Sequence, residues 1–355
     1  MTLAVLALAV VVVRALSSGG TPAATAPETP TAAQTSGPLA ATTTAETTTP
    51  ADGVPALTVQ GNRILRDGVP WWLLGYNSFT WSANCGHPEE LMTQDQVDQW
   101  LSSMRHDGHG AVRLFFFQGW SLERLDALLA SAERNNIYVI LTIDNALPDC
   151  GEERKTAEWF RDSQKAASYQ AWMTTLLQRY KGNTTIAWFE YFNEPGWEDG
   201  GLLDFITRMH DVAVTIDPDR LWSSGTIAPY AVGGPDNFRA INESRAVDIV
   251  SLHEYDFRDA ETHFGPATRE NAAGKPVLVG EFGVIDYNVD AAGCQADIAL
   301  RADRVQRKAE AYITVDGYVG ALAWSWQPGR GVGPCSSPGV DQDQQVQDLL
   351  RTITR

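Results

Sequence analysis

The sequence has little positive charge, little cysteine and no long apolar run. It contains 27 Lys and Arg residues against 44 Asp and Glu residues, which gives a formal net charge of −17. Because nucleic-acid phosphates and anionic lipids are bound by basic surfaces, this balance argues against a nucleic-acid partner and against recruitment to anionic lipid. The apolar run at residues 1–13 is shorter than the ~20 residues that a membrane span needs.

Signatures of metal, nucleotide and phosphate binding are also missing. The six histidines form no HExxH motif, and the four cysteines lack the spacing of a zinc site. No Gly-rich phosphate turn follows the first apolar strand, and no lysine ends a strand. These absences disfavour a dinucleotide-binding sheet and a barrel lyase, aldolase or isomerase. We therefore expect no metal and no other cofactor.

Composition divides the chain into three parts. Residues 1–20, with their apolar start, predict a signal peptide or a short membrane anchor. Residues 21–55 are rich in Ser, Thr, Ala and Pro, and they bury too little apolar surface to offset the entropy of ordering, so they predict a disordered linker. Residues 56–355 have globular composition and predict a single domain. An exported chain with such a stalk would be secreted or tethered to the outer cell surface, where disulfides are permitted.

The body alternates apolar runs with amphipathic segments. Gly61 and Asn62, at the centre of residues 59–65, predict a small β-hairpin. Eight strands are predicted at 73–77, 111–117, 137–143, 186–192, 221–225, 247–252, 277–282 and 319–326. Helices are predicted after each of them, around 94–104, 122–129, 169–180, 202–216, 237–245, 259–273, 296–315 and 341–354. Eight β/α units in ~300 residues predict an α/β fold of the TIM-barrel type, and a doubly wound open sheet is the alternative.

Two glutamates stand at the ends of strands where barrel enzymes carry their chemistry. Asn193 and Glu194 follow the fourth strand, and Glu281 lies near the end of the seventh. Glycoside hydrolysis needs one protonated carboxyl to assist the leaving oxygen and one ionised carboxylate at the anomeric carbon. A single glutamate is more often a surface residue, but a pair at two strand ends indicates this chemistry.

Other strand ends carry polar and aromatic residues. Arg113 lies inside the apolar second strand and needs an anion nearby, either in a structural ion pair or beside a catalytic carboxylate. His253 and Tyr255 project to one side of the sixth strand, because side chains alternate along a strand. Trp324 ends the eighth strand, where an indole can stack on a sugar, and Asn77 ends the first.

Taken in order, these strand ends resemble glycoside hydrolase family 5, a family of retaining barrel glycosidases, over roughly residues 57–355. The resemblance implies that Glu194 is the acid/base and Glu281 the nucleophile. It implies that Arg113 and Tyr255 orient Glu281 and hold its pKa down. The other substrate-binding residues that it implies are Asn193 at the sugar 2-hydroxyl, His253 near the acid/base, Trp324 under the sugar at the cleaved bond, and Asn77.

Two features bear on the branch of the family. Many cellulase-type members carry a histidine near the end of strand 3, whereas this chain has Asp144 and Asn145 there. The following segment, 145–159, looks more like the mannanase branch. Glu190, within strand 4, is interpreted as a buried structural glutamate.

Tryptophans and cysteines fall in the loops after the strands. Trp81, Trp120 and Trp197 are candidate sugar platforms, although each could equally pack its own loop. Four cysteines permit three pairings, and neighbouring loops favour Cys85–Cys150 and Cys294–Cys335.

The sequence therefore predicts a monomeric, retaining endo-β-1,4-glycanase, mannanase- or cellulase-like, that acts on neutral β-linked polysaccharide or oligosaccharide by a two-glutamate double displacement. Two alternatives stay open at this point: an exo-acting β-glycosidase on β-1,3-glucan or cell-wall glycan, and a carbohydrate-binding barrel without catalysis.

Overall fold

The computed structural model describes residues 53–82, 91–196, 201–255, 264–283, 298–327, 340 and 344–353. Its strands are β1 Leu57–Gln60, β2 Arg63–Arg66, β3 Val69–Pro70, β4 Leu73–Ser78, β5 Ala111–Phe115, β6 Tyr138–Thr142, β7 Ile186–Glu190, β8 Trp222–Ser223, β9 Val250–Glu254, β10 Val277–Phe282 and β11 Tyr318–Ala323. Its helices are α1 Gln94–His106, α2 Leu122–Arg134, α3 Ala157–Arg161, α4 Ser163–Arg179, α5 Gly201–Ile216, the 3-10 helix η2 Pro229–Val232, α6 Pro235–Glu243, α7 Gly265–Glu270, α8 Ile298–Thr314 and α9 Gln344–Thr352.

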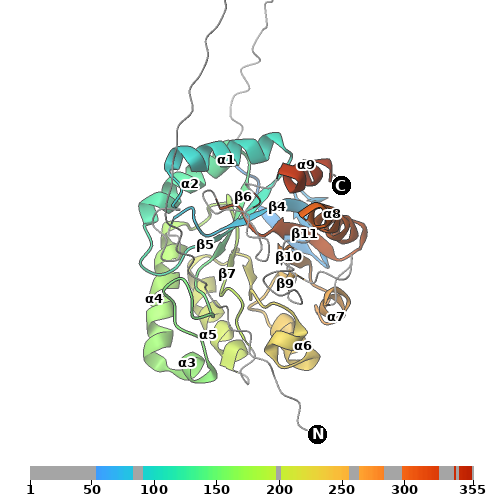
Figure 1. Ribbon diagram of the computed structural model, residues 1–355. Coiled ribbons are helices and arrows are strands. Elements are labelled where there is room, and N and C mark those ends of the chain that lie inside the picture. The colour runs from blue at the N-terminus through green and yellow to red at the C-terminus, as the bar shows by residue number, and fades with distance from the viewer. Residues whose placement is uncertain are drawn as a thin grey trace, which may run out of the picture. The chain divides into compact units, whose positions relative to one another are not determined.

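Eight parallel strands form the centre of the molecule, and helices surround them (Figure 1). The strand order is β8-β7-β6-β5-β4-β11-β10-β9. Strands that follow one another in the chain are therefore adjacent in the sheet, and the first strand, β4, pairs with the last, β11. A parallel bridge between Ser223 and Ile249 joins the β8 and β9 ends of this order and closes the ring. The predicted TIM barrel is thereby confirmed.

The strands are apolar because both of their faces are covered. Every residue of β5, β6, β7 and β10 is buried. Helices cover the outside through one apolar stripe each; in α1 this stripe is Val97, Trp100, Leu101 and Met104. A capping box begins α1: the Thr93 hydroxyl accepts from the Gln96 N–H, and the Gln96 side chain accepts from the Thr93 N–H. The short helices α3 and η2 were not predicted, because neither is long enough to show helical periodicity.

A small antiparallel sheet lies at the amino-terminal end of the barrel strands. β1 pairs with β2 as the predicted hairpin, and Gly61 takes a φ of 58° in its turn. β3 adds a third strand beside β2, and the chain then passes directly into β4. This sheet therefore lies at the opposite end of the barrel from the carboxyl ends of the strands, where the predicted site residues are.

The predicted signal or anchor (1–20) and all but the last three residues of the predicted linker (21–55) lie outside the described residues. Within the parts of the chain that the structure describes, no helix is both long and apolar enough to cross a membrane.

Candidate active site

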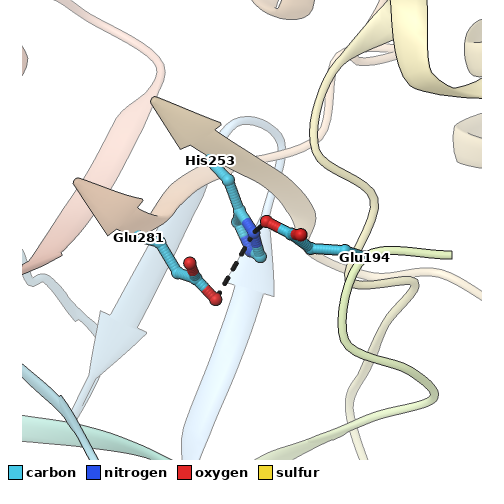
Figure 2. A group of neighbouring side chains, drawn as sticks. All are labelled: Glu194, His253 and Glu281. Atoms are coloured by element: carbon cyan, nitrogen blue, oxygen red, sulfur yellow. Dashed lines mark hydrogen bonds and ion pairs between the residues drawn. The ribbon is translucent and has the colours of Figure 1, made fainter. Parts of the chain in front are cut away.

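Glu194 and Glu281 face each other at the carboxyl end of the barrel, with His253 between them (Figure 2). Glu281 lies within β10, and Glu194 follows the end of β7 by four residues. One carboxylate oxygen of each glutamate and one nitrogen of His253 all lie within 4.8 Å of one another. The two glutamates that were predicted as a pair are therefore brought together.

The backbone at Glu194 is held in an unusual conformation. Its φ is 49°, in the left-handed region that few residues other than glycine adopt and that recurs at functional sites. The Glu194 N–H donates to the carbonyl of Gly225, 3.1 Å away, just past β8. A β-carbon on Gly225 would lie only 1.7 Å from the carbonyl oxygen of Phe192, so glycine is required for this close approach.

Arg113, fully buried on β5, organises the floor of the site. Its Nη1 donates to Glu281 Oε1 at 2.7 Å and to Asn77 Oδ1 at 3.0 Å. Its Nη2 donates to Glu190 Oε1 at 2.6 Å and to Asn193 Oδ1 at 2.9 Å, and its Nε donates to Glu190 as well, at 2.8 Å. One guanidinium thus joins two carboxylates and two amides from three other strands, β4, β10 and β7 with its carboxyl end.

Glu190 is the structural partner of this arginine. It is fully buried and accepts hydrogen bonds from Thr142 Oγ1 on β6 and from Ser223 Oγ on β8, both at 2.9 Å. All of its partners are groups of the barrel. The interpretation of Glu190 as a buried structural glutamate is confirmed.

Glu194 lies where its carboxyl tends to stay protonated. Burial raises the pKa of Glu194 to about 7; Arg113 lowers it, and Asp149 and Glu190 raise it further. His253 Nδ1 lies 2.9 Å from Glu194 Oε1. Burial lowers the pKa of His253 to about 4, so the imidazole is neutral at physiological pH and does not force Glu194 to ionise.

Glu281 has a more ionic environment. Tyr255 Oη donates to its Oε2 at 2.5 Å and Arg113 to its Oε1. Burial raises the pKa of Glu281 above its ordinary value, while His253, Arg113 and the Tyr255 hydrogen bond oppose that rise. The prediction that Arg113 and Tyr255 hold the pKa down has the right sign for each contact. Desolvation of the carboxylate outweighs both contacts, so the net shift of the Glu281 pKa is upward.

The asparagines at the site are tied to the barrel. Asn77, 1% exposed, donates from Nδ2 to the carbonyls of Gly280 and Leu322, and its Oδ1 accepts from Arg113. Asn193 donates from Nδ2 to Asn145 Oδ1 at 3.2 Å. The predicted contacts of Asn77 and Asn193 with sugar stay predictions.

Asn145, which was not predicted as a site residue, extends this network. It is fully buried, bridges to Asn193 through the backbone and donates from Nδ2 to Asp149. Its position directly after strand 3 was the only signal in the sequence.

The tryptophans divide between the core and the site. Trp81 is 1% exposed, donates from Nε1 to the Phe115 carbonyl at 3.0 Å and packs in the core. The prediction that Trp81 is a sugar platform is therefore wrong, because no face of its ring is open. Trp324 and Trp120 are half-buried beside an aromatic cluster that includes Phe115, and their stacking on sugar stays a prediction. Trp197 lies outside the described residues.

Of the cysteines, only Cys150 falls within the described residues, and it takes part in a disulfide. Cys85, Cys294 and Cys335 lie outside them, so the two predicted pairings stay predictions.

A second ionic cluster holds the segment after β6. Lys155, 4% exposed, lies 3.0 Å from a carboxylate oxygen of Asp144 and 3.0 Å from one of Glu152. Its ammonium also lies over the ring of Trp159, 4.9 Å from the centroid. Despite this lysine, burial raises the pKa of Asp144 to about 7. These residues line a cavity of about 300 Å³ between the segment after β6 and helix α4.

Within the described ranges, Glu194, His253 and Glu281 are the group whose donor atoms are close enough to hold a metal ion. The guanidinium of Arg113 already occupies Glu281 Oε1, and its charge disfavours a second cation at that oxygen. The chemistry of the group therefore fits proton transfer and nucleophilic attack better than metal ligation.

Glu194, with its raised pKa, and Glu281, paired with Arg113, lie at the carboxyl-terminal ends of β7 and β10. A TIM barrel with two such glutamates has the architecture of a glycoside hydrolase. The family follows from the sequence itself: residues 91–329 match the model of cellulase, glycosyl hydrolase family 5, so the chain belongs to that family and is an O-glycosyl hydrolase of it. The resemblance seen in the strand ends is confirmed.

Individual relatives agree with this assignment. The chain is 26% identical over 334 residues to mannan endo-1,4-β-mannosidase A of Podospora anserina, an alignment that covers 79% of this chain and 85% of the relative. It is also 26% identical over 193 residues to a probable mannan endo-1,4-β-mannosidase F of Aspergillus flavus, covering 46% of this chain and 42% of that protein.

Solved structures share the fold. The endo-1,4-β-mannanase of Rhizomucor miehei superimposes with a TM-score of 0.60 at 18% identity, over 84% of this chain and 97% of that one. The catalytic domain of an endoglucanase of Thermobifida fusca, solved with cellotetraose, superimposes with a TM-score of 0.59 at 18% identity, over 84% and 98%.

Proposed function

We propose that this family 5 enzyme is a retaining endo-β-1,4-glycanase that hydrolyses β-mannan, with Glu281 as nucleophile and Glu194 as acid/base. The observation that carries the proposal is the spacing of the two carboxylates, whose nearest oxygens lie within 4.8 Å of each other. Retaining enzymes hold their carboxyl groups about 5–5.5 Å apart, whereas inverting enzymes leave about 6.5–9.5 Å for a water molecule.

The environments of the two glutamates support this division of roles. Glu194, with a pKa of about 7, can donate a proton to the glycosidic oxygen as the bond breaks. Glu281, paired with Arg113 and Tyr255, attacks the anomeric carbon and forms a glycosyl ester. Glu194, now ionised, then takes a proton from water, whose oxygen attacks the anomeric carbon and releases Glu281.

Mannan is the favoured substrate because of the relatives. Several curated relatives are named mannan endo-1,4-β-mannosidase, and the segment after β6 carries Asp144 and Asn145 where many cellulases carry histidine. Cellulose-type glucan is the second candidate, supported by the fold shared with a cellotetraose-binding endoglucanase. Loops set specificity on a common barrel, so the two substrates are separated by experiment.

The test is hydrolysis of galactomannan, carboxymethylcellulose and laminarin by the wild type and by Glu281→Ala. The proposal predicts a mixture of manno-oligosaccharides from early time points, because endo action cuts within the polymer. Glu281→Ala should produce none, and azide should restore cleavage of an aryl glycoside with inversion. Release of monosaccharide alone would instead indicate exo action, and turnover by Glu281→Ala would refute the role of this glutamate.

We also propose that the enzyme is a monomer that works outside the cytoplasm, secreted or tethered to the cell surface. The apolar start of the sequence, the Ser/Thr/Ala/Pro-rich segment and the disulfide at Cys150 support this location. Fractionation of the producing cells tests it, since recovery of the active enzyme in the cytoplasm would contradict it.

A further inference from the structure

One aromatic side chain on the barrel is exposed in a way that the core does not explain. Tyr230, in η2 after β8, is 53% exposed. Of the large hydrophobic residues that the structure describes, the other two exposed ones are the aliphatic Val69 and Val214. The Tyr230 ring packs against Phe264, with 4.4 Å between ring centroids and an interplanar angle of 34°. Phe264 is half-buried and so supports one side of the tyrosine.

Both rings are anchored at the end of β9, beside His253. The carbonyl of Ile227 accepts a hydrogen bond of 2.9 Å from the His253 N–H. Tyr230 follows Ile227 by three residues, and a chain of that length spans at most about 11 Å. Phe264 donates its own N–H to the carboxylate of Glu254 at 3.2 Å, and Glu254 directly follows His253. Two separate segments thus bring the aromatic pair to one strand end at the mouth of the barrel.

This strand end lies on the side of the acid/base. Glu194 makes its backbone hydrogen bond to Gly225 past β8 and its side-chain contact to His253 on β9. The half-buried Trp324, predicted to lie under the sugar at the cleaved bond, belongs to the far side, since it follows β11 and packs on Phe79 and Phe115 of the β4–β5 region. The acid/base protonates the oxygen of the leaving group, so the leaving part of the glycan is on the β8–β9 side.

We propose that Tyr230, backed by Phe264, is a stacking platform for a pyranose ring of the leaving-group part of the substrate. The proposal rests on the proposed function. The ligand is a neutral sugar of the same glycan chain, because an aromatic face offers apolar contact to the C–H face of a pyranose and no charge. Tyr230 is a specificity-determining residue rather than a catalytic one, since it acts on substrates long enough to reach it.

The experiment compares a substrate that has sugars beyond the cleaved bond with one that has none. One is the glycan polymer that the wild type cleaves fastest; the other is the β-fluoride of the corresponding trisaccharide, whose leaving group is a single atom. Tyr230→Ala should lower kcat/KM on the polymer about tenfold, equivalent to about 1.4 kcal/mol, and leave kcat/KM on the fluoride within about twofold. Tyr230→Phe and Tyr230→Trp should retain polymer activity, because both keep an aromatic face. Val69→Ala, which removes another exposed apolar side chain at the opposite end of the barrel, is the matched control and should change neither value.

Two results would overturn the platform: an unchanged kcat/KM of Tyr230→Ala on the polymer, or an equal loss on both substrates, which would indicate a structural role. If Tyr230→Ala fails to fold, Phe264→Leu should give the same selective loss with a smaller amplitude, and its absence overturns the proposal. If the wild type cleaves neither substrate, the proposed function fails. Calorimetry with a hexasaccharide then still tests whether Tyr230 stacks on sugar, because Tyr230→Ala must bind the hexasaccharide several-fold more weakly than the wild type.

Discussion

Replacing Glu194 with glutamine should stabilise the protein at alkaline pH while removing its acid catalyst. The pKa of Glu194 is about 7 in the folded chain against an ordinary value of 4.5. The ionised carboxylate is therefore about 3 kcal/mol less favourable in the folded chain than in the unfolded one. Because the folded pKa is the higher one, this penalty is absent below pH 4.5, grows between pH 4.5 and 7, and is complete above pH 7.

Glutamine keeps the shape of the side chain and has no charge to desolvate. The free energy of unfolding of Glu194→Gln should equal that of the wild type at pH 4 and exceed it by up to about 3 kcal/mol at pH 8.5. For a chain of this size that corresponds to a rise in Tm of about 6 °C. Scanning calorimetry of both proteins from pH 4 to pH 9 measures the difference directly.

The activity of the same variant provides a second readout. The wild-type kcat/KM should fall as pH rises through about 7, where Glu194 loses its proton. Glu194→Gln should lose about 10²–10⁴-fold on natural glycans and much less on a dinitrophenyl glycoside, whose leaving group needs no proton.

Glu190→Gln is the matched control, because it makes the same change four residues earlier on the same segment. It removes a buried partner of Arg113 and should destabilise the protein by roughly 3–5 kcal/mol, the opposite sign. The reasoning is refuted if Glu194→Gln is no more stable than the wild type at pH 8.5. It is refuted as well if the kcat/KM profile of Glu194→Gln still falls as pH rises through about 7.

Three further substitutions test the surroundings of the two glutamates. Tyr255→Phe removes the 2.5 Å hydrogen bond to Glu281. Because that hydrogen bond lowers the pKa of Glu281, its loss should raise this pKa and move the acidic limb of the kcat/KM profile to higher pH. An acidic limb that does not move would contradict the contact. Asn145→Ala removes the acceptor of the Asn193 amide hydrogen bond and should lower kcat on glycan about tenfold while the protein stays folded. A kcat equal to that of the wild type would show that Asn145 does not position Asn193. Lys155→Met removes a buried ammonium from the half-buried carboxylates of Asp144 and Glu152 and should lower the free energy of unfolding by roughly 3 kcal/mol at neutral pH. The loss should be smaller at pH 4, where Asp144 is protonated in both proteins, and a loss independent of pH would argue against the ion pairs.

The barrel could be predicted from the sequence because its strands are buried on both faces. Each predicted strand overlaps an observed one, and β10 agrees at both ends. β8 shrinks to Trp222–Ser223, since its predicted end, Gly225, turns away to contact β7 and Glu194. Strand ends were less certain than strands, because hydrogen bonding and not hydrophobicity decides where a strand stops.

The site was predictable where it lies on regular strands. Arg113, His253 and Glu281 lie within β5, β9 and β10, and parallel strands bring their carboxyl ends together. The net pKa of Glu281 was not predictable, because it depends on the balance between burial and contacts with three strands, which only coordinates reveal.

Side chains in loops were the least predictable. Trp81 follows β4 just as a cleft residue would, yet its indole N–H turns to the Phe115 carbonyl and the ring enters the core. The ion pairs of Lys155 with Asp144 and Glu152 depend on how the segment after β6 folds back, which no periodicity reports. Tyr230 gave no signal in the sequence because its exposure follows from the path of η2.

The central claim is that Glu281 forms a covalent bond to the substrate. Incubation with a 2-deoxy-2-fluoro glycosyl fluoride slows both chemical steps, while the fluoride leaving group lets the first step proceed, so that the glycosyl-enzyme accumulates. Mass spectrometry of the intact protein should show the addition of one glycosyl unit, and peptide mapping should place it on Glu281. A label on any other residue, or steady hydrolysis of glycan by an enzyme that never becomes labelled, would contradict the double-displacement mechanism.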